Sequence, residues 1–256
     1  MKFILASALL VIGVCAQHDH THSGNHEHHR VNVDVYYESL CPDSRKFFNQ
    51  QLYPSLQGEL KQFVNLTLVP YGKSTTESNL GNLVFKCHHG DIECYGNKLH
   101  ACALHNIERG NNTMGLGFNK VATGFVNCLM DKSVKKEDQE PQMSFPSNDC
   151  ANLNQVPNVN IIDNCAKHHD GSTYLAQAGN MTDMLMKPLK SVPTIVFDKI
   201  YKMEDSQMAQ KNFVKALCQY IKMSPKPATC LENSAYTKEI SVTAILLAFV
   251  LSKFVF

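Results

Sequence analysis

The segment Val31–Phe48, VNVDVYYESLCPDSRKFF, decides the fold because an apolar strand pattern runs into a cysteine and a helix start. Alternating valines from Val31 to Val35 begin a β-branched run that is typical of a buried strand. Cys41 follows this run, and the fixed φ angle of Pro42 suits the first position of a helix. The segment therefore predicts a strand, a cysteine and a helix, in that order.

A thiol at this place is a candidate nucleophile. The free N–H groups and the dipole at a helix N-terminus stabilise the thiolate of a cysteine such as Cys41. Ser44 stands where a dithiol enzyme has the second cysteine, whose sulfur releases the reduced substrate from a mixed disulfide. Its hydroxyl can donate a hydrogen bond to the Cys41 sulfur but cannot perform that release. We therefore expect Cys41 to act alone, with release by an external thiol, such as glutathione or cysteine, or by a thiol of the substrate.

The first sixteen residues, MKFILASALLVIGVCA, predict a secretory signal peptide cleaved after Ala16; a transmembrane start is the alternative. Secretion favours disulfides, since they persist in oxidising compartments. Ten cysteines minus Cys15, lost with the leader, leave an odd number, nine. Cys41 is the candidate for the unpaired sulfur; the alternative is that it joins a structural bridge.

The rest of the N-terminal part predicts a βαβ unit. Residues 44–60 have helical apolar spacing, with Pro54 expected to kink or end the helix. Residues 63–69 alternate, which predicts a strand with Asn65 and Thr67 on an exposed face. Such a unit is normally parallel and right-handed.

The following segments predict a helical insertion and a return to the sheet. Residues 73–187 are rich in turns and cysteines, so we expect an insertion of helices tied by disulfides. Residues 192–198, VPTIVFD, then predict a strand that opens with proline, and residues 206–222 predict one helix. The fold class expected is α/β.

The two ends have other compositions. Residues 17–30 hold six histidines and predict a flexible tail, which either binds zinc or copper or is simply solvated. Residues 231–256 end in an apolar segment that predicts membrane attachment, by a glycolipid-anchor signal or a single spanning helix, over a soluble product. A formal net charge of +1 gives no indication of nucleic acid binding.

Three sequons predict a secreted glycoprotein. They begin at Asn65, Asn111 and Asn180, and modified asparagines are expected to face solvent.

A second motif, CHHGDIECYGNKLHAC, spans residues 87–102. Its mixture of cysteine and histidine suggests zinc, but its spacing matches no short-loop metal site, and secretion favours disulfides. The motif resembles the signature of the gamma-interferon-inducible lysosomal thiol reductase family, which has eight fixed positions. Seven match, and His88 replaces a glutamine; the matching residues are Cys87, His89, Gly90, Glu93, Cys94, Asn97 and Cys102.

The resemblance covers residues 31–230 and implies a thioredoxin-like fold with a helical insertion at about 73–187. It implies a cis proline at Pro193 facing the Cys41 sulfur, and reduction of protein disulfides at acidic pH in lysosomes. Eight cysteines can form four bridges, whose pairing stays open: Cys87, Cys94, Cys102, Cys128, Cys150, Cys165, Cys218 and Cys230.

We therefore expect a thiol oxidoreductase of the secretory pathway or lysosome that uses Cys41, Ser44 and Pro193, with no metal and no organic cofactor. Its partners would be protein disulfides and a small thiol. Ser44 leaves one alternative open, a thioredoxin-like binding protein that captures partners through Cys41 without turnover. A metal-handling protein that uses the histidine tail is a third hypothesis.

Overall fold

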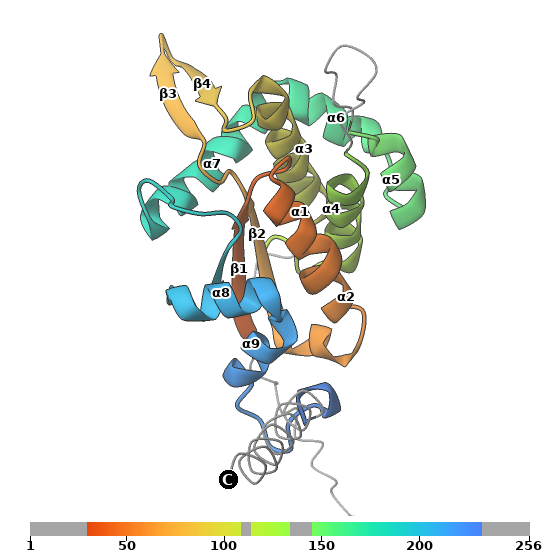
Figure 1. The fold of residues 1–256 in the computed structure, drawn as a ribbon. Helices are drawn as coiled ribbons and strands as arrows, with labels where there is room; N and C mark the ends of the chain where they lie inside the picture. The colour runs from red at the N-terminus through yellow and green to blue at the C-terminus, as the bar shows by residue number, and fades with distance from the viewer. Residues whose placement is uncertain (1–29, 109–113, 134–144, 232–256) are drawn as a thin grey trace, which may run out of the picture.

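The computed structural model describes residues 30–108, 114–133 and 145–231 (Figure 1). The predicted signal peptide, nearly all of the histidine tail, Asn111 and the apolar C-terminal segment lie outside these residues. Within the described part, no helix combines the length and the apolar character that a membrane crossing requires.

A three-stranded sheet lies at the centre, in the order β2-β1-β5. β1 (Val31–Tyr37) pairs in parallel with β2 (Val64–Pro70) and antiparallel with β5 (Thr194–Phe197). One face of β1 places its valines in the larger core with the first helix, whereas Tyr36 points into a second apolar cluster on the opposite face. Because the sheet is covered on both faces, its strands are almost wholly buried.

The predicted helix after Cys41 is present, and it ends at Ser55, one residue after Pro54, rather than at residue 60. α1 (Pro42–Phe47) continues through the π-helical turn η1 (Phe48–Leu52) into α2 (Tyr53–Ser55). Pro54 has no N–H for a regular helical hydrogen bond, which fits a widened turn just before it. A short 3-10 turn, η2 (Glu59–Phe63), then leads into β2 and completes the βαβ unit.

The predicted exposed face of β2 is wrong. Thr67 is buried, and Asn65 is half-buried, with its Nδ2 donating to Asn32 Oδ1 at 2.9 Å and its Oδ1 accepting from the Gly115 N–H at 2.7 Å. The insertion covers this edge, since the Leu68 N–H donates to the Leu116 carbonyl. The sequon at Asn65 therefore does not face open solvent, whereas Asn180 is exposed.

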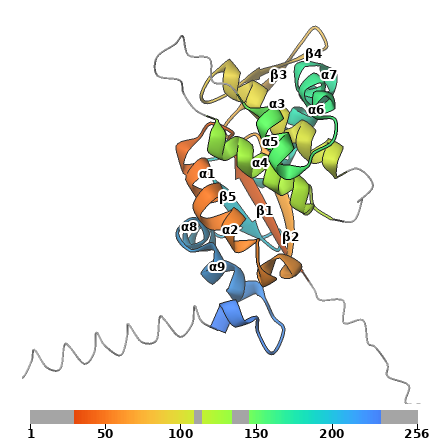
Figure 2. The same cartoon turned by 90° about the vertical axis from the view of Figure 1, so that its right-hand side faces the viewer.

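The insertion contains five helices among its described residues and an exposed hairpin that the sequence did not predict. The hairpin, β3 (Thr75–Asn79) and β4 (Asn82–Lys86), projects from one end of the molecule (Figure 1). The helices, which Figure 2 shows from a second side, are α3 (Asp91–Ile107), α4 (Lys120–Lys132), α5 (Ser147–Asn154), α6 (Val159–Lys167) and α7 (His169–Leu185).

Disulfides tie these helices together. The bridge between Cys102 and Cys165 joins α3 to α6, and the bridge between Cys128 and Cys150 joins α4 to α5. Cross-links of this kind stabilise a fold mainly by restricting the unfolded chain.

The C-terminal helix is divided in two. α8 (Met203–Lys211) and α9 (Phe213–Tyr220) replace the single helix predicted for 206–222. Asn212 separates them, and its side chain caps α9 by accepting the Lys215 N–H. The βαβ unit, the antiparallel strand and the helical insertion confirm the expected thioredoxin-like α/β fold.

Candidate active site

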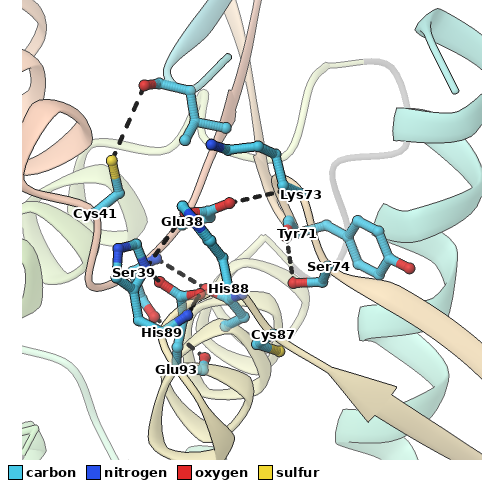
Figure 3. Close-up of polar contacts among 12 residues, drawn as sticks. Glu38, Ser39, Cys41, Tyr71, Lys73, Ser74, Cys87, His88, His89 and Glu93 are labelled. Carbon is cyan, nitrogen blue, oxygen red and sulfur yellow. Dashed lines mark hydrogen bonds and ion pairs between the residues drawn. The ribbon is translucent and has the colours of Figure 1, made fainter. Parts of the chain in front are cut away.

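Cys41 lies at the C-terminal end of β1 and forms the N-cap of α1. Among the described cysteines it alone is outside a disulfide. Its thiol faces the Val192 carbonyl oxygen at 4.0 Å (Figure 3). The peptide bond between Val192 and Pro193 is cis. Two segments that lie 151 residues apart in the sequence therefore meet at one sulfur: the loop between β1 and α1, and the turn before β5.

The surroundings of this sulfur are apolar. Cys41 is 7% exposed and belongs to a cluster with Tyr36, Leu175, Leu189 and Val192. Gln210 on α8 fixes the proline turn, since its Nε2 donates to the Pro193 carbonyl at 2.9 Å. A disulfide that reaches Cys41 must therefore approach past apolar side chains from α7 and the proline turn.

Ser44 does not make the hydrogen bond expected of it. Its side chain is fully buried in α1, and its hydroxyl has no hydrogen-bond partner among the described residues. The hydroxyl is therefore not bonded to the Cys41 sulfur. No second thiol stands near that sulfur in the described chain.

The motif at residues 87–102 is hydrogen-bonded to the loop before Cys41. Gly90 is the N-cap of α3, and its φ of +85° favours glycine. A disulfide joins Cys87, which precedes this helix, to Cys94 inside it. Asn97 on α3 accepts the Ser39 N–H at 2.9 Å. The Ser39 hydroxyl donates to the Glu93 carbonyl, so the residue two before Cys41 is bonded twice to α3.

A cluster of two carboxylates and two imidazoles lies at the same place (Figure 3). Glu38 Oε2 is 3.2 Å from His88 Nδ1 and 3.5 Å from His89 Nδ1, and His89 Nδ1 is 2.6 Å from Glu93 Oε2. Glu38 Oε1 accepts the Lys73 N–H. Burial, and then the negative charge of Glu38, raises the pKa of Glu93. Glu38, His88 and His89 are also the group in the described chain whose ligand atoms could hold a metal ion.

A third polar contact lies deeper. The Tyr37 hydroxyl is 3.1 Å from His100 Nδ1, and both side chains are fully buried. Burial lowers the pKa of His100 to about 3, so this imidazole is neutral at ordinary pH.

Comparison with known proteins identifies relatives of this chain. A model of the family "Gamma interferon inducible lysosomal thiol reductase (GILT)" matches residues 32–154. GILT-like protein 1 of Drosophila melanogaster is 41% identical, over 85% of this chain and 86% of its own. This chain belongs to the GILT family. A GILT reductase-like protein of Anopheles gambiae is 39% identical, over 86% of this chain and 88% of its own.

Among solved structures, DsbA of Chlamydia trachomatis matches with a TM-score of 0.49 and 11% identity, covering 77% of this chain and 90% of its own. Membership of the GILT family supports a thiol oxidoreductase in general terms.

The structure brings two of the predicted site residues, Cys41 and Pro193, to the same place. It buries the Ser44 hydroxyl in α1 without a hydrogen-bond partner among the described residues. Sequence reasoning missed Glu38, although it stands in the decisive segment. Its signal was a carboxylate at the end of a buried strand, three residues before a reactive cysteine. The hydrogen bond from the Ser39 N–H to Asn97 could not be predicted from the sequence, since the two residues are 58 positions apart.

Proposed function

We infer that this GILT-family chain is an oxidoreductase of the secretory route or lysosome that cleaves protein disulfides through Cys41 alone. The position of Cys41 carries this proposal, because an unbridged thiol at a helix N-terminus faces a cis-proline turn. The names of the family and of its relatives support disulfide-containing proteins as the substrate class.

The proposed cycle balances with two molecules of a small thiol such as glutathione or cysteine. The Cys41 thiolate attacks one sulfur of the substrate disulfide; a bond forms between these two sulfurs, and the other substrate sulfur leaves as a thiolate. The first small thiol then attacks the Cys41 sulfur and releases the reduced substrate. The second displaces Cys41, and the two small thiols leave together as one disulfide. The substrate gains two electrons, and no organic cofactor takes part.

A turnover assay at acidic and neutral pH tests this proposal. The mature chain with excess small thiol should reduce many equivalents of a protein disulfide, and Cys41→Ala should reduce it no faster than the thiol alone. Equal rates for the variant and the parent protein would refute a role for Cys41.

A capture protein remains the second candidate, and the isolation of the Cys41 thiol favours it. Without a second thiol nearby, a mixed disulfide at Cys41 lasts until an outside thiol arrives. A trap would stop after one equivalent of substrate even in excess small thiol, whereas the enzyme would continue. The same assay therefore separates the two functions.

A further inference from the structure

We propose that Glu38, His88 and His89 form a binding site for a divalent cation of the zinc class. The ligand atoms of these three residues lie within 4.8 Å of one another. They come from two segments, the loop before Cys41 and the turn before α3, so a cation would join the two (Figure 3).

Two of the three distances between the ligand atoms fit zinc. With bonds of about 2.0–2.2 Å, the ligand atoms of a tetrahedral zinc site are about 3.3–3.6 Å apart. Glu38 Oε2 lies 3.2 Å from His88 Nδ1 and 3.5 Å from His89 Nδ1. Two imidazoles and one carboxylate, with a fourth position left for water, are a known ligand set for zinc.

The charges also favour a cation. Glu38 and Glu93 have fully buried side chains, and every salt bridge that they make in the described chain goes to His88 or His89. No lysine or arginine side chain compensates these carboxylates there. Buried carboxylates are costly to ionise without a cationic partner, and a divalent cation would stabilise their charge directly.

The site is reachable from solvent. The side chains of His88 and His89 are 47% and 34% exposed, so a hydrated ion can approach. Glu93 Oε2 now lies 2.6 Å from His89 Nδ1, and Glu93 Oε1 accepts the His89 N–H at 3.0 Å. When the cation replaces the proton at Nδ1, Glu93 Oε2 loses its hydrogen bond and must turn aside, whereas the bond from the His89 N–H to Glu93 Oε1 can remain.

His88 makes this site a property of this chain, because the family signature has glutamine at that position. His88→Gln is therefore a mild variant: an amide can still donate a hydrogen bond to Glu38, but it is a poor zinc ligand.

Zinc titration of the full mature protein tests the proposal. The six histidines of the tail would also bind zinc, so every protein compared carries glutamine at those positions: His18, His20, His22, His26, His28 and His29. The parent protein should bind one Zn²⁺ and unfold at a higher temperature with it. His88→Gln should weaken binding at least ~10-fold and remove that thermal shift.

Two further variants complete the test. His169→Gln changes an exposed histidine outside the cluster and should bind zinc as the parent does. Cys41→Ser should also bind normally, because the thiol is not one of the ligands. Unchanged binding in His88→Gln, or equal losses in His88→Gln and His169→Gln, would overturn the proposal. Loss of binding in Cys41→Ser but not in His88→Gln would also overturn it, since the ion would then be held by the thiol.

Discussion

The loop from Glu38 to Cys41 has two unlike sides. Toward α3 it is polar, since Glu38 meets two histidines and Ser39 makes hydrogen bonds with Asn97 and Glu93. Toward the proline turn it is apolar, and the Cys41 sulfur has one long contact at 4.0 Å. The polar side therefore fixes the loop, whereas the apolar side leaves the Cys41 thiol with few hydrogen bonds that must break when it reacts.

The two sides of the loop are formed by different segments of the chain. The polar side comes from the first part of the insertion, whose motif is bound to the loop through α3, and α7 is the last helix of the same insertion. The apolar side combines α7 with the turn before β5. Changes on the apolar side should therefore alter the chemistry of the thiol, and changes on the polar side should first alter its position.

The largest expected effect comes from adding a second thiol in α1, the helix whose N-cap is Cys41. Ser44→Cys would place a second sulfur three residues after Cys41, so the reduced substrate should leave without an external thiol. The two thiols belong to one chain, and release should be at least ~100-fold faster than with a dilute small thiol. Single-turnover reactions, quenched with acid and analysed by mass spectrometry, measure the mixed disulfide and its decay.

Ser44→Ala is the matched control, since it removes the hydroxyl without adding sulfur. The hydroxyl has no hydrogen-bond partner in the described chain, so the first attack should proceed at the parent rate. A large loss in Ser44→Ala would show that the hydroxyl assists Cys41 after all. A mixed disulfide that persists in Ser44→Cys would show that the buried position cannot resolve it.

On the polar side, Gly96→Ala should move the loop. A Cβ atom at Gly96 would lie 2.1 Å from Phe145 Cζ and 2.5 Å from Ser39 Oγ. Overpacking of this kind typically costs about 1–3 kcal/mol of unfolding free energy, and the displaced loop should slow disulfide cleavage. Gly58→Ala is the control, because nothing lies within 4 Å of its added Cβ. Denaturant unfolding and the turnover assay measure both effects, and equal behaviour of the two variants would contradict the close contact.

Local sequence patterns predicted the parts of this site that local physics determines. The strand of valines, the cysteine and the proline at the helix start were all placed correctly. The odd number of cysteines left one sulfur over, and the structure leaves Cys41 free. These features depend on neighbours along the chain or on composition, both of which a single sequence contains.

The remaining features depend on contacts between distant segments. Thr67 looked exposed because its strand alternates, yet residues 115–117 of the insertion cover that edge. The partners of Glu38 lie some fifty residues away, so no local pattern shows them. The exposed hairpin was missed because β3 is polar and β4 has three apolar residues in a row, so neither strand shows the alternation that marks a half-buried strand.

An effect on stability alone, with no expected change in the chemistry of Cys41, lies beneath the polar side, at His100. Its folded pKa is about 3, against an ordinary value of 6.5, so below pH 6.5 the unfolded chain binds a proton that the folded chain does not. The free energy of unfolding should therefore fall by about 1.4 kcal/mol per pH unit as pH drops from about 6.5 toward 3. Above pH 6.5 this contribution is constant.

His100→Gln isolates this effect, because an amide can still bond to the Tyr37 hydroxyl but does not titrate. Urea unfolding at several pH values should give a shallower loss of stability in His100→Gln than in the parent protein. His168→Gln should keep the parent slope, since His168 is exposed. If His100→Gln and the parent protein lose stability in parallel, then burial does not lower the pKa of His100 in the folded protein.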